Sequence, residues 1–125
     1  MHKVKFFLNF FSVFVFSSAF AIDWHKVDEF DGKSYYVDIS NIKKQDKFVY
    51  YSELIDFEEA IYGALSRIRT FKANCATMER ASISVTSYTG QMGKYIVINE
   101  AKNDGTRFIK DTQPNTLKFA CARAM

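Results

Sequence analysis

Hydrophobic and polar residues alternate along several short stretches of the chain, as they do in β-strands that bury one face in a sheet. Aromatic and β-branched residues are concentrated in the same stretches, which favours strands over helices. The predicted strands span residues 35–39, 48–57, 81–89, 94–101 and 106–111. Turn-forming sequences separate them, and two of these, DGKS at 31–34 and NDG at 103–105, predict hairpins.

Residues 57–78 are ambiguous between helix and strand. Their apolar positions recur every three or four residues, and this periodicity by itself favours a helix. The alternative places a break at Gly63 and a strand at 66–75, in which Arg67 and Arg69 share one face. The helical positions are Phe57, Ile61, Leu65, Ile68, Phe71, Cys75 and Met78.

The C-terminal segment predicts a helix. Thr112 is placed to cap it, Pro114 falls in its first turn, and Leu117, Ala120 and Cys121 face inward. The whole pattern predicts an α+β fold, in which a C-terminal helix packs on a single antiparallel sheet of about five to six strands.

Residues 1–21 have the parts of a secretory signal peptide. Lys3 and Lys5 form a basic start, and an apolar stretch from 6 to 20 follows. Ala19 and Ala21 give the small-x-small pattern of a cleavage site, which predicts a cut before Ile22. The alternative, an uncleaved anchor, needs about 20 apolar residues. We therefore expect no stable membrane anchor, and an exported protein of the periplasm, the cell surface or the medium.

Removal of the signal peptide changes the charge and the composition. Seven of the 13 phenylalanines lie within it, and without its two lysines 15 basic residues face 14 acidic ones. Because the remaining chain is nearly neutral, we expect it not to bind nucleic acid. Residues 22–125 are long enough for one domain with a modest core.

Cys75 and Cys121 are the two cysteines of the chain. Export leads to an oxidising compartment, where such a pair forms a structural disulfide. A loop of this length gives about 4 kcal/mol of stabilisation in the chain-entropy description. The alternatives are a redox pair, which usually needs closer spacing, and a metal site, which needs further ligands. The bridge would join the C-terminal helix to the segment that carries Cys75.

The sequence predicts no catalytic site, metal or cofactor. His25 lacks a paired acid or nucleophile motif, so we interpret it as an exposed or edge-strand histidine. The acidic clusters at 28–31 and 53–59 lack calcium-loop spacing and are interpreted as solvated turns. Asp38 follows a predicted strand, where its carboxylate can cap the next turn.

Basic and tyrosine side chains are the candidates for binding. A basic surface for an acidic partner would consist of Lys43, Lys44, Arg67, Arg69 and Lys72, with Arg80. Tyrosines suit interfaces because they bury a large area with few torsions; the candidates are Tyr50, Tyr51, Tyr88 and Tyr95. The alternative is that the tyrosines line the core and the charges coat the solvent face.

The order of several segments resembles the bacterial surface-adhesin protein E family. These segments are Trp24, YYVDISNIKK at 35–44, FVYYSELIDF at 48–57, the run from Gly63 to Gly93, and FACA at 119–122. The resemblance implies a strand at 66–75, against its helical periodicity, and a disulfide between helix and sheet. Two features depart from the family: no lipid-anchor cysteine follows the signal, and Phe108 stands where many relatives carry tryptophan.

This resemblance implies a non-enzymatic domain that binds host matrix or envelope proteins. The alternatives are a periplasmic structural or accessory protein and, less favoured, a small hydrolase or inhibitor. A homodimer formed through a sheet edge is a further expectation.

Overall fold

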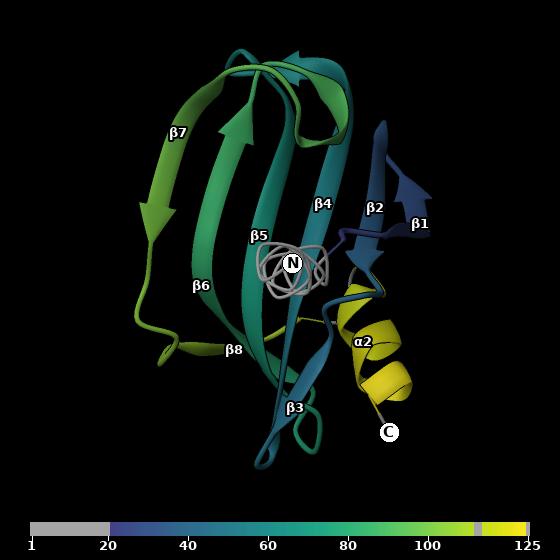
Figure 1. The fold of residues 1–125 in the computed structure, drawn as a ribbon, viewed down its shortest axis with the longest axis vertical. Helices are drawn as coiled ribbons and strands as arrows, with labels where there is room; N and C mark the ends of the chain where they lie inside the picture. Colours follow the sequence, from purple (N-terminus) through teal and green to yellow (C-terminus); the bar gives the residue numbers. More distant parts are fainter. Residues whose placement is uncertain (1–20, 112–113, 125) are drawn as a thin grey trace, which may run out of the picture.

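The computed structural model describes residues 21–111 and 114–124. The predicted signal peptide therefore lies outside the described residues, except for Ala21. Within the described residues the chain forms one curled antiparallel sheet of eight strands and a C-terminal helix (Figure 1). The strands are β1 (Trp24–Phe30), β2 (Lys33–Asp38), β3 (Lys43–Gln45), β4 (Phe48–Ile61), β5 (Ala64–Asn74), β6 (Glu79–Tyr88), β7 (Val97–Lys102) and β8 (Phe108–Lys110).

The strand order is β1-β2-β4-β5-β6-β7, and β3 pairs with β4 while β8 pairs with β6. The expectation of five to six strands is therefore too low. In β1 a register shift between Lys26 and Asp28 interrupts the alternation of apolar and polar residues, so the sequence pattern does not indicate a strand there. The other missed strand, β3, has only three polar residues and is recognisable through its pairing with β4.

The hairpin between β4 and β5 resolves the ambiguous segment. Tyr62 and Gly63 form its turn with φ values of 50° and 80°, which a helix does not accommodate. The helix favoured by periodicity is therefore wrong, and the strand implied by the resemblance is confirmed. Apolar residues occupy both faces of β5, because Phe71 packs in the core while Ile68 lies against the 90–95 loop near Gly93. A strand covered on both faces does not show a simple alternation.

The predicted hairpin at residues 103–105 is also wrong. β7 and β8 do not pair with each other, since both pair antiparallel with β6. β7 lies along residues 84–88 of β6 and β8 along residues 79–81, so the two strands form one interrupted edge. The residues between them, 103–107, form a loop at this interruption.

The C-terminal helix α2 (Thr116–Ala124) is bonded through Cys75–Cys121 to the turn that directly follows β5, which confirms the predicted disulfide, although Cys75 lies one residue beyond the strand expected to carry it. Leu117, Ala120 and Cys121 are buried, as predicted. Thr112 lies outside the described residues. The first turn begins after Pro114 rather than including it, since the carbonyl of Asn115 accepts the bond from the Phe119 amide.

The face of the sheet that α2 covers is called the inner face. It carries the main core cluster, in which Val37, Tyr51, Phe71 and Ala73 pack against the buried side of α2. The opposite, outer face carries Leu54 and Ile68, over which the loop with the short 3-10 helix η2 (Gln91–Gly93) folds. The inner face is thus covered where α2 lies and open toward β7 and β8 (Figure 1).

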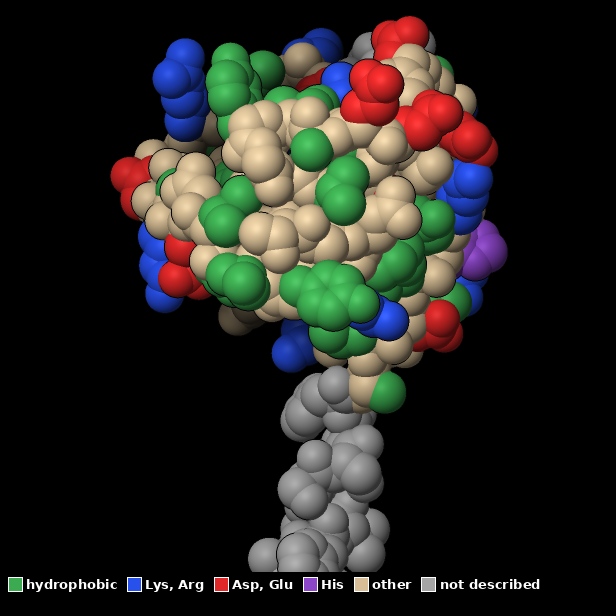
Figure 2. Space-filling model, turned by 90° about the horizontal axis from the view of Figure 1, so that it is seen from above, with side chains coloured by type: hydrophobic (Ala, Val, Ile, Leu, Met, Phe, Trp, Pro, Cys, Tyr) green, Lys and Arg blue, Asp and Glu red, His purple; other side chains and the backbone are tan. Residues whose placement is uncertain are grey.

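Figure 2 looks onto the end of the sheet that carries the β4–β5 hairpin and shows acidic side chains gathered at one corner. Asp31, Glu58 and Glu59 line a hollow of about 380 Å³ between the β1–β2 turn and the end of β4. β8 lies at the opposite end of the sheet (Figure 1).

Candidate functional site

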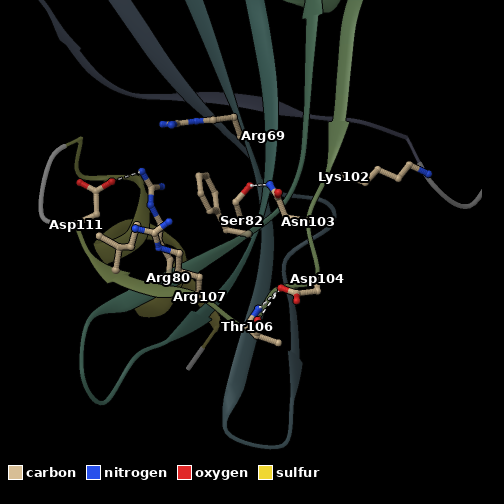
Figure 3. A pocket seen from close by; sticks show the side chains of 11 residues that line it. Arg69, Arg80, Ser82, Lys102, Asn103, Asp104, Thr106, Arg107 and Asp111 are labelled. Carbon is tan, nitrogen blue, oxygen red and sulfur yellow. Dashed lines mark hydrogen bonds and ion pairs between the residues drawn. The ribbon is translucent and has the colours of Figure 1, made fainter.

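A pocket of about 730 Å³ opens on the inner face beside β8 (Figure 3). Three parts of the chain line it: β5, β6, and the segment from Lys102 to Asp111 that includes the loop between β7 and β8. The lining residues are Arg69, Phe71, Arg80, Ser82, Lys102, Asn103, Asp104, Thr106, Arg107, Ile109 and Asp111.

An irregularity in β6 turns two side chains toward this pocket. Thr70 pairs with Ser84 and Phe71 pairs with Ser82, so Ile83 is an extra residue in β6. Such a β-bulge changes which residues face each side of a sheet. Ser82 and Arg80 consequently lie on the inner face with Phe71, at the level where the edge breaks between β7 and β8.

The loop at the break is held by its own hydrogen bonds. The Asp104 carboxylate accepts bonds from the Thr106 hydroxyl and amide, at 2.7 and 3.1 Å, and these bonds lower its pKa. The Asn103 amide bonds the Ile83 carbonyl, and its side-chain Nδ2 bonds Ser82 Oγ at 3.0 Å. Gly105 is buried with φ 71°, a conformation that L side chains rarely adopt.

Glu53 lies behind the pocket and is the centre of a buried ion cluster. Its side chain is fully buried and accepts hydrogen bonds from Arg69, Arg80 and Thr116. The Arg69 Nε–Oε1 distance is 2.9 Å and the Arg80 Nη1–Oε2 distance is 3.0 Å. The expectation that Glu53 belongs to a solvated turn is therefore wrong.

Arg80 is nearly as buried as Glu53 and uses most of its donors within the protein. It donates to Tyr51 Oη at 2.8 Å, to Thr116 Oγ1 at 3.2 Å and to Asp111 Oδ2 at 2.7 Å, besides its bond to Glu53. Burial by itself lowers the pKa of Arg80, but the charges of Tyr51 and Glu53 and the bond to Asp111 outweigh it and raise the pKa. Arg80 is therefore a permanently charged wall of the pocket.

Two guanidinium groups lie over the ring of Phe71. The guanidinium carbon of Arg80 is 3.8 Å from the ring centroid and that of Arg69 is 5.1 Å from it. Cation–π attraction adds to the bonds with Glu53, so both groups are fixed in position before any ligand arrives. Figure 3 shows Arg69 extending from β5 toward the side of the pocket where Arg80 and Asp111 meet.

Arg107 differs from these two arginines. It is exposed, and no described residue forms a hydrogen bond or ion pair with it. Lys102 points away from the arginines in Figure 3, in agreement with its pairing to Ser84 of the outer face. At the pocket the described residues thus place three guanidinium groups and the Lys102 ammonium against three carboxylates, those of Glu53, Asp104 and Asp111.

The structure divides the basic residues predicted as one surface between the two faces, with Arg80 on the inner face beside Ala73. Arg67 and Arg69 share the inner face, as the strand alternative predicted. Lys43 and Lys72 lie on the outer face, on either side of Tyr50. Lys44 pairs with Val49 and therefore lies on the inner-face side of β3. The inner-face arginines and the outer-face lysines therefore cannot bind one partner group together.

Arg67 is also engaged within the sheet. Its Nε donates to Ser87 Oγ at 3.2 Å, and its guanidinium lies 5.4 Å from the centroid of the Phe57 ring. It does not line the pocket, so of the predicted basic residues only Arg69 and Arg80 belong to it.

The other predicted candidates have mixed outcomes. Tyr51 is 1% exposed and belongs to the core, so its placement among exposed tyrosines is wrong, whereas Tyr95 is 83% exposed. His25 is exposed on edge strand β1, as expected, and its ring stacks on Phe119 with centroids 5.4 Å apart. Asp38 caps the turn after β2 as predicted, accepting bonds from the Ser40 amide and from Asn41 Nδ2.

Arg107 and Ser82 in the pocket, and Glu53 behind it, are the site residues that the sequence patterns missed. The pattern around Glu53 contains several acids, and nothing in it separates the buried one from the solvated ones. Pairing between Glu53 and Arg69 on neighbouring strands is the signal that would have found it, and this pairing requires the strand register.

Comparison with known proteins identifies the chain at the level of its family. A family model described as surface-adhesin protein E matches residues 24–124. The chain belongs to this family. Membership implies an adhesin-like, exported or surface protein, and no helix among the described residues is long and apolar enough to cross a bilayer.

Crystal structures of Haemophilus influenzae protein E share the fold. Crystal form II gives a TM-score of 0.56 at 17% identity and covers 85% of this chain and 97% of that chain. The protein from non-typeable Haemophilus influenzae gives a TM-score of 0.51 at 17% identity, with 82% and 83% covered. No curated protein matches the chain. At this identity the structural likeness establishes the fold.

Proposed function

We propose that this surface-adhesin protein E family member is an exported, non-enzymatic domain that binds a protein of the host matrix or of the cell envelope. The observation that supports this proposal most directly is the open pocket on the inner face. Arg69 is held by buried Glu53 and is still partly exposed to solvent, as in sites that recognise acidic groups at low entropic cost.

A binding assay with defined partners tests the proposal. The oxidised, purified protein is immobilised and exposed to a panel of purified extracellular-matrix proteins and, separately, to extract of the source cell's envelope. Saturable binding to one identified protein, weakened by added salt because the contacts are charged, is the expected result. No saturable binding in either arm contradicts the proposal.

Location separates an adhesin from a periplasmic accessory protein. An adhesin is digested when intact cells are treated with protease, whereas a periplasmic protein is digested only after the outer membrane is opened. We expect digestion on intact cells or recovery from the medium. Strict protection in intact cells would favour the accessory role. The intact mass of the protein recovered from the cells tests the predicted cut before Ile22.

The sheet-edge homodimer stays a prediction, and β7 is the edge that suits it. All six residues of β7 are exposed, and Tyr95 and Ile96 before it are exposed as well. An exposed edge strand can pair with another strand. Light scattering after size-exclusion chromatography would give the mass of two chains if this pairing forms, and the mass of one chain if it does not.

A further inference from the structure

The pocket beside β8 has the features of a specific subsite for one negatively charged group. It combines donors from β5, β6 and the loop between β7 and β8, which are brought together by the bulge at Ile83 and the break in the edge. Among the described residues, the donors available to a ligand include the Arg107 guanidinium, Arg69 Nη1 and the hydroxyl hydrogen of Ser82. Ser82 Oγ already accepts from Asn103 and can still donate.

The charge balance selects the kind of anion. The cationic groups at the pocket are the guanidinium groups of Arg69, Arg80 and Arg107 and the ammonium of Lys102. Glu53, Asp104 and Asp111 offset three of these four charges, and Arg107 has no partner among the described residues. A single negative charge balances this excess, whereas a doubly charged phosphate would be repelled by Asp111 and by Asp104 on the rim. The forked guanidinium also matches the two oxygens of a carboxylate.

The walls of the pocket suit the stem that carries such a group. Ile109 is 55% exposed and lines the same pocket as Phe71. An aliphatic stem can lie against Ile109 while its carboxylate reaches the arginines. The pocket therefore offers a charged end and an apolar side to the same ligand.

We propose that Arg107, Arg69 and Ser82 bind one carboxylate of a partner polypeptide, supplied by an acidic side chain or by a chain terminus. This inference rests on the proposed function as a protein-binding domain and names the chemistry of its site. Arg69 and Ser82 are held in advance by Glu53 and Asn103, so Arg107 is the residue whose loss changes binding without disturbing the core.

Short peptides test the proposal on the oxidised protein. Amide resonances in ¹H–¹⁵N spectra are followed during titration with four probes: acetyl-Gly-Glu-Gly-amide, acetyl-Gly-Gly-Gly with a free carboxylate, acetyl-Gly-Gln-Gly-amide, and inorganic phosphate. We expect saturable shifts at residues 80–82 and 103–107 with at least one carboxylate peptide. The glutamine peptide should cause none, and phosphate should bind more weakly. The response to the first two probes distinguishes a side chain from a terminus as the source.

Arg107→Gln is the decisive variant, and Lys110→Gln is its matched control. Lys110 is also exposed and lies three residues away, but it pairs with Glu79 on the outer face. We expect Arg107→Gln to raise the Kd of the carboxylate peptide at least about tenfold, since it removes a charge-assisted bidentate contact. Lys110→Gln should leave the Kd within about twofold, as expected for a distant exposed charge.

The outcomes separate this inference from the proposed function. Equal Kd values for Arg107→Gln and the parent protein, equal shifts with the glutamine peptide, or tighter binding of phosphate would each overturn the carboxylate site. Partner capture that is unaffected by Arg107→Gln would overturn the site and leave the proposed function standing. Peptide binding without any partner capture would support the site and contradict the proposed function.

Discussion

The two sides of the inner face differ in what covers them. Where α2 covers the sheet, Val37 of the sheet and Leu117 and Ala120 of the helix are buried almost completely. A disulfide also bonds the helix to the turn after β5. Along the other side every residue of β7 is exposed, and β8 has one half-buried residue. Both sides have the same antiparallel hydrogen bonding, so backbone pairing forms the strands but does not decide where the stability lies.

The comparison also separates stability from recognition. The buried cluster of Glu53 and Arg80 lies at the boundary between the two sides, where it stabilises the packing of α2 through Thr116 and fixes Arg69 at the pocket. The uncovered side adds Arg107 and the loop that holds it. One ion cluster thus contributes to the core on one side and to the candidate binding pocket on the other.

Substitution of Glu53 by glutamine is expected to have the largest effect. It leaves Arg80 and Arg69 without their shared carboxylate, and removing one partner of a buried ion pair costs about 3–5 kcal/mol. The free energy of unfolding, measured by urea denaturation, should fall by this amount. A loss below about 1 kcal/mol, the range of exposed ion pairs, would show that the cluster does not join the two sides.

Removal of the disulfide should have the next largest effect. The double variant Cys75→Ala/Cys121→Ala frees a loop of sequence separation 46. The expected loss is about 4 kcal/mol from chain entropy. Urea denaturation of the variant and of the chemically reduced protein should give similar losses. An unchanged midpoint in both would contradict the view that the covalent bond stabilises the covered side.

A pair of truncations compares the two sides directly. Leu117→Ala removes a side chain that is 1% exposed in the core cluster, and a loss of about 3 kcal/mol is expected. Ile109→Ala on β8 removes a side chain that is 55% exposed and should cost less than about 0.5 kcal/mol. Thermal denaturation of both variants checks the difference, and equal losses would refute the comparison.

The smallest expected effect concerns the loop over the outer face. Burial raises the pKa of Asp56, although the bond from the Met92 amide opposes this shift. The folded protein therefore binds the Asp56 proton more tightly than the unfolded chain does. The free energy of unfolding falls as the pH rises from the ordinary aspartate pKa of 3.8 to the raised pKa of folded Asp56. Asp56→Asn should flatten the stability profile in this window. A profile identical to that of the parent protein would contradict the assignment.

Local sequence signals predicted the regular parts of the fold. The DGKS turn gives the β1–β2 hairpin, because Asp31 and Gly32 accept positive φ values of 54° and 72°. The C-terminal helix and the disulfide were also predictable, since an apolar stripe favours a packed helix and two cysteines in an exported chain can form only one internal bridge. These features depend on neighbouring residues or on one pair.

The remaining features depend on pairing between distant strands. The apolar residues Ile68 and Phe71 show helix-like spacing because each face of β5 is covered by a different part of the chain. The NDG turn resembles a hairpin, but long β6 pairs with both flanking strands and prevents them from pairing together. Arg69, Arg80 and Arg107 line one pocket only after strand pairing, including the bulge at Ile83, has set the register. The pocket was therefore not predictable from the sequence.

Hydrogen exchange measured by mass spectrometry tests the central comparison most directly. Amides of β4 and β5, which lie in the middle of the sheet, should exchange only through global unfolding. Amides of β7 and of residues 103–107 should exchange through local opening, at least about a hundredfold faster, a difference of roughly 2.7 kcal/mol in opening free energy. Equal protection of β7 and β5 would contradict the account, because the uncovered side would then be as stable as the side beneath α2.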